Sequence, residues 1–540
     1  MGKNPALGVT LAIGLATFVA TPVTAESRKP NGFAWANRLT WGVSSQPIAG
    51  PQPGTAAWLN AQLSPHPDDR LPPAMAAQIA SMEISQKSVA ELLVEQDAAQ
   101  RAANKLADPT QRDAARAINN QHVNDLMTDA ATRSLLRDVS APDQLREQLT
   151  WFWFNHFNVS SGKADIRITV GDYEDTIRSH ALGRFRDLLE VTLKHPAMLR
   201  YLDNDQNAAK HINENYAREI MELHSMGVGS GYTQGDVQEL ARILTGVGVN
   251  IKSDPPKLKD DHKALYVREG VFEFNPDRHD FGEKKFLNHA IKGAGFAEVE
   301  EALDLIAASP ATAHHVSKQL AAYFMGGDPP AEVVDRMAAA WKRSDGDIPT
   351  VLRALIRTSA FKQSLQTAMK DPVHFTVSAL RLMYGDQPTI VNMRPAISWL
   401  NRMGEGLYAH DTPDGYPMDN AAWIGPGQMA ARFEVARQIG SGGGGLFVVA
   451  PPPPVPTVVS AVLPGTGAVP FVLNLRPISA LVTRPAPASA TPPLPRLQNS
   501  ALYDTIGPDL AGPTKAVLAQ AKAPAQWNAL FLSSPEFMRR

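Results

Sequence analysis

Helix-forming sequence dominates residues 55–437, and this pattern narrows the possible folds more than any other feature of the chain. Ala, Leu, Glu, Gln, Arg and Met prevail there, and the connecting segments are short. Leu145, Leu149 and Trp153 recur at a spacing of four and give one helix an apolar stripe. Only residues 264–288, rich in β-branched and aromatic side chains, favour a hairpin. We therefore predict a mainly α fold: a large multi-helix orthogonal bundle with a small β-hairpin insertion and a Pro/Gly-rich irregular segment.

Local signals predict several helix boundaries. Residues 140–143 (SAPD) and 233–236 (TQGD) have the composition of capping boxes, each expected to open a helix. One helix is expected over residues 214–226, because Gly227 follows as a typical C-terminal stop. Helical signals return after the Pro/Gly-rich segment, over residues 512–532.

Charge and cysteine content exclude several classes of protein. The chain has 52 Lys and Arg against 54 Asp and Glu, a formal net charge of -2. This balance argues against a nucleic-acid-binding protein, whose affinity comes from contacts with phosphates. Cysteine is absent, which excludes disulfides, thiol catalysis, iron–sulfur clusters and cysteine-bound zinc.

The first 25 residues have the features of a secretory signal peptide. Lys3 supplies the positive charge, an apolar run follows over residues 6–20, and small residues precede a cleavage site after Ala25. An uncut membrane anchor is the alternative interpretation. We expect cleavage, a periplasmic or extracellular location, and no transmembrane anchor in the mature chain, because no later stretch is long and apolar enough.

Composition changes abruptly after Arg437. Residues 438–475 contain no Asp, Glu, Lys or Arg, and proline is concentrated over residues 440–495. Proline on this scale prevents continuous helix. We therefore divide the chain into a signal peptide (1–25), a helical core domain (26–437), a Pro/Gly-rich linker or insert (438–497) and a C-terminal helical segment that packs on the core (498–540).

Polar residues on apolar helix faces are the first candidates for a catalytic site. His156 lies in the apolar stripe beside Trp153, and His224 falls on the buried face of its own helix. An unpaired buried imidazole is unfavourable, so we expect at least one of the two to approach Glu219 or Glu222. His279 belongs to a third polar group, at the end of the predicted hairpin. The five residues would suit a metal or acid–base site if they converge, and structural, hydrogen-bonded histidines are the alternative.

A calcium-binding loop is a second candidate. Asp203, Asp205, Asn207 and Glu214 occupy positions 1, 3, 5 and 12 of such a loop, and hard oxygen ligands at these positions suit Ca²⁺ or another divalent metal. Ala208 stands where the pattern needs glycine, however. The alternative interpretation is a solvated turn in which Asn213 caps the next helix.

Several stretches together resemble a bacterial family known as domain of unknown function 1800. The longest is residues 213–224 (NENYAREIMELH), and Val247 departs from the tryptophan usual in the family after Leu-Thr-Gly. The other matching stretches are residues 36–42 (ANRLTWG), 152–157 (FWFNHF), 181–189 (ALGRFRDLL), 195–198 (HPAM), 201–204 (YLDN), 231–237 (GYTQGDV), 241–246 (ARILTG), 310–313 (PATA) and 534–537 (SPEF), together with His279, Asp280 and Lys284.

The resemblance implies an exported protein of unknown activity. Members often occur beside domain of unknown function 1501, which resembles secreted sulfatases or phosphatases. This association favours a binding or accessory protein of the cell envelope that works with such a sulfatase-like or phosphatase-like partner. The alternatives are a metal-dependent or acid–base enzyme with a His/Glu pocket, and a surface protein whose Pro-rich segment recruits other molecules.

Overall fold

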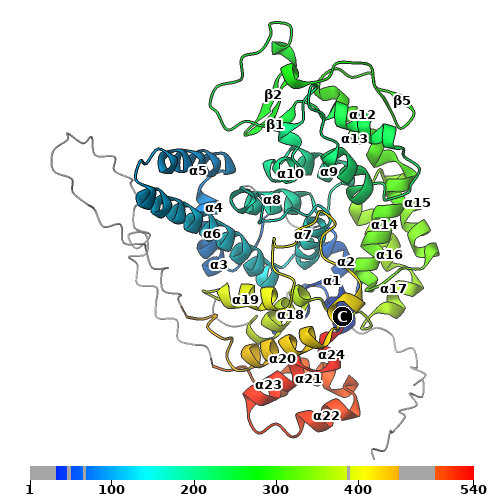
Figure 1. The fold of residues 1–540 in the computed structure, drawn as a ribbon. Coiled ribbons are helices and arrows are strands. Elements are labelled where there is room, and N and C mark those ends of the chain that lie inside the picture. Colours follow the sequence, from blue (N-terminus) through cyan, green and yellow to red (C-terminus); the bar gives the residue numbers. More distant parts are fainter. Residues whose placement is uncertain (1–31, 46–49, 65–67, 164, 386–389, 449–492) are drawn as a thin grey trace, which may run out of the picture.

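The computed structural model describes residues 32–45, 50–64, 68–163, 165–385, 390–448 and 493–540. The predicted signal peptide and most of the Pro/Gly-rich segment, residues 449–492, lie outside the described residues. The chain is mainly α-helical, as predicted, and the strands of its described part form two small antiparallel sheets (Figure 1). None of the described helices combines the length and the apolar character that a membrane span requires.

Proline and capping side chains determine where the N-terminal helices begin. Asp108 caps the longest helix, α6, by accepting hydrogen bonds from the backbone N–H groups of Thr110 and Gln111. The capping box predicted at residues 140–143 is wrong, because helical hydrogen bonding continues through Ser140, the last residue of α6. The helices of this half are α1 (Gly32–Leu39), α2 (Ala56–Gln62), α3 (Pro73–Ala80), α4 (Glu83–Gln86), α5 (Val89–Asn104), α6 (Pro109–Ser140), α7 (Gln144–His156), α8 (Ile166–His180), α9 (Phe185–Lys194) and α10 (Pro196–Tyr201).

The middle of the chain carries the strands and an irregular helix. The segment predicted as one helix over residues 214–226 is α-helical only over α11 (Asn215–Glu219) and continues as a π-helical turn over Ile220–His224. The Thr233 capping box is confirmed and opens α12 (Gln234–Ile243). The predicted hairpin is also confirmed, and a third strand from earlier in the chain pairs with the second strand of that hairpin. The sheets are β1-β3-β2, from β1 (Val247–Val249), β2 (Val267–Glu269) and β3 (Phe272–Phe274), and β4-β5, from β4 (Lys285–Phe286) and β5 (His289–Ala290).

The remaining helices complete the body and carry the chain to its end. Helical structure over residues 512–532 is split into two helices, because residues 519–523 interrupt it and Pro524 starts the second one. These helices are α13 (Phe296–Ala308), α14 (Pro310–Met325), α15 (Ala331–Ser344), α16 (Ile348–Ile356), α17 (Ser359–Ser364), α18 (Pro372–Tyr384), α19 (Arg394–Arg402), α20 (Pro426–Gly440), α21 (Ala501–Ile506), α22 (Gly512–Leu518), α23 (Pro524–Leu532) and α24 (Pro535–Met538).

Two large hydrophobic clusters form the interior. The first surrounds α7, where Phe152, Trp153 and Phe157 are fully buried, as the apolar stripe predicts. The second is shared between α18, α20 and the C-terminal helices, and it buries Trp527 and Phe531 of α23. α23 packs along α20, although more than 80 residues separate them in the chain (Figure 1). The C-terminal helices therefore supply part of the core.

The first described helix and the last residues of the chain are joined directly. Arg38 of α1 is fully buried and donates to the backbone oxygens of Phe324, Ser364 and Arg540, the last at 2.6 Å. The neighbouring Asn37 donates to the backbone oxygen of Arg539 at 2.7 Å. Figure 1 accordingly shows the C-terminus beside α1.

Candidate functional site

His156 and His224 are both buried, as predicted, but neither forms a hydrogen bond with Glu219 or Glu222. The Nε2–H of His156 instead donates to the backbone oxygen of His224 at 2.9 Å, and the two ring centroids are 6.1 Å apart. The predicted pairing with glutamate is therefore wrong. The end of the helix is the physical reason, because His224 is its last residue and the backbone oxygens of a last helical turn have no partner within the helix.

Two of the other predicted catalytic residues, Glu222 and His279, have separate partners, while burial raises the pKa of Glu219. Glu222 accepts a hydrogen bond from Arg218, one turn earlier, at 3.3 Å. His279 lies in another environment, where its ring meets the backbone oxygen of Thr245 at 2.8 Å and a carboxylate oxygen of Glu298 at 3.3 Å. The structure thus brings together His156 and His224 but does not join them to Glu222 or His279.

Three of the four calcium-loop residues use their side-chain oxygens in other contacts. Asp203 forms an ion pair with Lys163 at 2.8 Å. The side-chain oxygen of Asn207 accepts the backbone N–H of Asn213 at 2.9 Å, and Glu214 accepts hydrogen bonds from Arg218 and Gln234. Burial raises the pKa of Asp205, the fourth residue. Across the part of the chain that the structure describes, no group of three or more His, Asp or Glu side chains is arranged to hold a metal ion, and the predicted calcium site remains a prediction.

The buried histidines give the fold a defined dependence on pH. Burial lowers the pKa of His156 to about 3, and burial together with His156 lowers that of His224 to about 3. In the unfolded chain these imidazoles take up protons below pH 6.5, whereas in the folded chain they do so only near pH 3. Their stabilising contribution is therefore complete above pH 6.5 and is lost as the pH falls toward 3.

We expect each imidazole to reduce the free energy of unfolding by about 2 kcal/mol between pH 7 and pH 5. His156→Gln keeps a side-chain N–H donor and should remove this loss from one site. Denaturant unfolding at the two pH values measures the difference. His314→Gln, which changes an exposed histidine of α14, is the control and should behave as wild type. Equal pH dependence in all three proteins would contradict the prediction.

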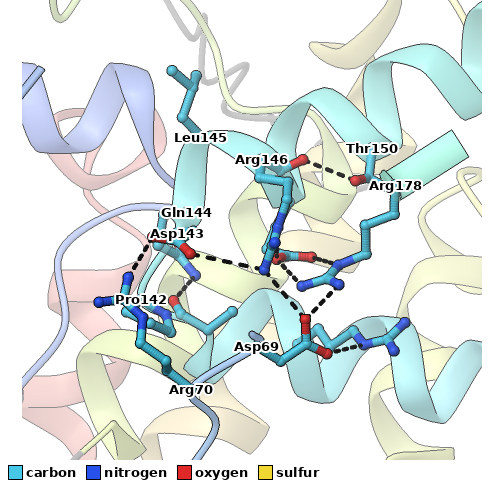
Figure 2. A network of polar contacts seen from close by, with 12 residues as sticks. Asp69, Arg70, Pro142, Asp143, Gln144, Leu145, Arg146, Thr150 and Arg178 are labelled. Carbon is cyan, nitrogen blue, oxygen red and sulfur yellow. Dashed lines mark hydrogen bonds and ion pairs between the residues drawn. The ribbon is translucent and has the colours of Figure 1, made fainter. Parts of the chain in front are cut away.

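The densest polar network lies where α6, α7 and α8 meet, and we call it the arginine–carboxylate cluster (Figure 2). Its charged members come from these three helices, from the segment before α3 and from the residue before α7. The cluster extends inward from the surface. The side chain of Asp69 is about one-third exposed, whereas that of Glu147 is 2% exposed. The cluster consists of Asp69, Arg70, Arg133, Arg137, Asp138, Asp143, Arg146, Glu147, Glu174, Asp175 and Arg178.

Arg178 is the centre of the arginine–carboxylate cluster. Its guanidinium binds Glu147 in a two-pronged arrangement, with Nε–Oε2 at 2.8 Å and Nη2–Oε1 at 2.6 Å. Its third nitrogen donates to Asp69 at 2.6 Å, and Arg146 reaches the same oxygen at 3.3 Å. Burial alone would raise the pKa of Asp69, but the charges of Arg178 and Arg137 outweigh it and lower that pKa. Asp69 therefore remains ionised and is the carboxylate of the cluster that lies at the solvent-facing end.

Two further carboxyl groups lie deeper and behave differently. Burial and the neighbouring Glu147 and Glu174 raise the pKa of Asp138 well above its usual value. Burial also raises the pKa of Glu174, although the hydroxyls of Ser134 and Tyr408 donate to it at 2.7 and 2.6 Å. The cavity that Asp138, Glu147 and Glu174 line has a volume of about 10 Å³. This is about the room that one water molecule requires.

Sequence reasoning missed the arginine–carboxylate cluster entirely. Glu174 and Arg178 are four residues apart on α8, a spacing typical of ion pairs on solvent-exposed helix faces. Asp138 lies between Leu135 and Val139 on the same face of α6, and this position beside apolar residues is the local sign of a buried charge. The interactions that distinguish this cluster from an exposed face connect three helices and are not encoded in any one of them.

One comparison with known proteins identifies the family of the chain. The family described as a protein of unknown function (DUF1800) matches residues 34–539. The chain therefore belongs to the DUF1800 family, as its motifs predict. No curated protein and no solved structure matches the chain.

Proposed function

We propose that this protein is an exported binding or accessory protein of the cell envelope that works with a secreted partner resembling sulfatases or phosphatases. One observation supports this proposal over catalysis by the chain itself. The charged groups of the arginine–carboxylate cluster neutralise one another around a cavity of about 10 Å³. Pockets that bind small molecules are typically 300–1,000 Å³. The cluster therefore suits the stabilisation of a three-helix junction better than the turnover of a substrate.

A larger hollow lies between α20 and α23 and has the character of a contact surface. Its volume is about 300 Å³, and Arg437 is the only charged residue among those that line it. The remaining lining residues are small, polar or apolar: Ser441, Ala525, Gln526, Ala529, Leu530 and Ser533. Chemistry of the acid–base type needs titratable groups in pairs, so this composition favours binding.

The proposal is tested with the exported protein and the domain of unknown function 1501 protein from the same organism. N-terminal sequencing of the chain from the extracytoplasmic fraction should give Glu26, the residue after the predicted cleavage site. Titration calorimetry should then detect a complex with a Kd in the micromolar range or below, which corresponds to about 8 kcal/mol or more of binding free energy. A start at Met1 or Gly2 would contradict export, and no heat of binding would contradict the partner.

An acid–base enzyme is the second candidate, and the raised pKa of Asp138 favours it. Asp138 has a raised pKa and lies in the same cavity as Glu147, so the pair could supply an acid and a base. Asp138→Asn separates the two candidates. An accessory protein should keep its affinity for the partner in this variant, whereas an enzyme should lose hydrolysis of model phosphate or sulfate esters by the chain alone.

A further inference from the structure

Four cationic side chains are buried together where α1, α18, α20 and the end of the chain meet. Arg38, Lys370, Arg432 and Arg540 are each at most 3% exposed. Asp371 and Glu405 are the carboxylates whose charges act on this group. Burying a cation is unfavourable unless acceptors replace the water that it loses. The question is therefore which acceptors each cation finds.

Arg38 and Arg540 are well supplied with acceptors. Arg38 donates to three backbone oxygens, as described above. Arg540 contacts the ring Nδ1 of His374 at 2.9 Å and donates to the backbone oxygen of Tyr323 at 3.1 Å. It also lies 3.9 Å from a carboxylate oxygen of Asp371. These two side chains connect distant segments of the fold, and each leaves only its Nε without a partner in the described structure.

Arg432 and Lys370 are different. Within the described residues, none of the three guanidinium nitrogens of Arg432 has a hydrogen-bond partner, although the side chain is fully buried. The guanidinium lies over the ring of Phe375, and its carbon is 5.2 Å from the ring centroid. The ammonium group of Lys370 lies 3.9 Å from the centre of the Phe537 ring. Aromatic faces attract cations but do not replace hydrogen-bond acceptors.

The nearby carboxylates are directed elsewhere. Oε2 of Glu405 accepts the backbone N–H of Val373 at 2.9 Å, and Oδ1 of Asp371 accepts that of His374 at 2.6 Å. Oε1 of Glu405 has no partner in the described structure, although the charges of Glu405 and Arg432 act on each other. The guanidinium nitrogens of Arg432 and one carboxyl oxygen of Glu405 thus remain without partners in the described structure, and the charge of Arg432 acts on the buried Lys370.

The geometry points to a site for one small inorganic oxyanion, phosphate or sulfate, held by Arg432 and Lys370 together. The planar guanidinium presents paired N–H groups that match two oxygens of such an anion, and lysine adds a compact positive charge. Because the site is closed to solvent, we expect the anion to enter as the protein folds. Burial and the charges of Arg540 and Arg432 lower the pKa of Lys370 well below its usual value, an effect that a bound anion would oppose.

The test compares folding with and without the anion. The mature chain is exhaustively dialysed, and denaturant unfolding is measured while millimolar phosphate or sulfate replaces chloride at constant ionic strength. A ligand that binds only the folded state raises the apparent folding constant about 100-fold when its concentration reaches 100 times its Kd. We expect a saturable rise of this kind with phosphate, with sulfate or with both, and the anion that saturates at the lower concentration is the better ligand.

Arg432→Met should abolish the saturable rise. Arg381→Met is the matched control, because Arg381 is also buried but donates to the backbone oxygens of Gly42 and Val139. It should retain the rise, so a general salting-out effect would appear in both variants and overturn the proposal. Absence of any rise in wild type, which would mean that water alone fills the region, would also overturn it.

A second measurement covers the case in which Arg432→Met does not fold. Lys370→Met should lose the same response. In addition, wild-type protein is saturated with the oxyanion, desalted and then unfolded, and ion chromatography should recover about one equivalent of the oxyanion. Recovery of none, or protection by chloride to the same extent, would contradict the assignment.

Discussion

Arg178→Met is expected to lower the free energy of unfolding by about 3–5 kcal/mol, the range found when one partner of a buried ion pair is removed. The reason lies in Glu147, which is 2% exposed and accepts two hydrogen bonds from Arg178. Without the guanidinium this carboxylate is buried with its main counter-charge missing. Asp69 loses a partner as well. Denaturant unfolding, with the slope of the transition compared between proteins, measures the loss.

Arg184→Met is the matched control for this experiment. Arg184 forms an ion pair with Asp345 at 2.8 Å, but both side chains are more than half exposed. Exposed pairs contribute about 0–1 kcal/mol, so this variant should be nearly as stable as wild type. Similar losses in both variants would show that burial of the Arg178 pair has no special importance.

A chain that stops at residue 492 is expected to lose its cooperative fold. It lacks Trp527, Phe531, Leu532 and Phe537, all of which are buried in the second hydrophobic cluster. Each buried side chain of this size contributes about 1.5–3 kcal/mol, so together they account for roughly 6–12 kcal/mol. This is comparable with the whole stability of a typical domain. Circular dichroism and a thermal scan should show no cooperative transition near that of the full chain.

A cut chain provides the control for truncation. A site-specific protease sequence placed within residues 449–492 allows the backbone to be cleaved while both fragments remain present. The fragments should co-elute in gel filtration, because α23 packs along α20 and Asn528 donates to the backbone oxygen of Gly440 at 3.4 Å. Separation of the fragments under native conditions would contradict an essential role for the C-terminal helices in the core.

The helices themselves were largely predictable, because their signals are local. The spacing of Leu145, Leu149 and Trp153 identifies the buried face of α7, and all three are fully buried. Local patterns failed where a neighbouring element overrides them. The serine of the expected capping box was absorbed into the end of α6, and the helix that leads to His224 widens into a π-helical turn.

The candidate sites were less predictable for a different reason. Burial of His156 follows from its position in an apolar stripe, but its acceptor is a backbone oxygen, and backbone oxygens look alike in any sequence. The charged residues of the arginine–carboxylate cluster resemble an exposed helix face until three helices are packed together. Arg432 is likewise an ordinary arginine in the sequence, and only the surrounding core shows that it has no partner.

The contact between α1 and the end of the chain affects the order in which the protein can fold. Arg38 binds the backbone oxygen of Arg540, so two groups that are 502 residues apart in sequence must meet. A growing chain cannot make this contact until Arg540 has been added. Contacts between residues so distant in sequence also slow folding, because a long loop must close before they form. The first described helix therefore reaches its final environment late, after the segment that contains Arg540 has been made and has folded against it.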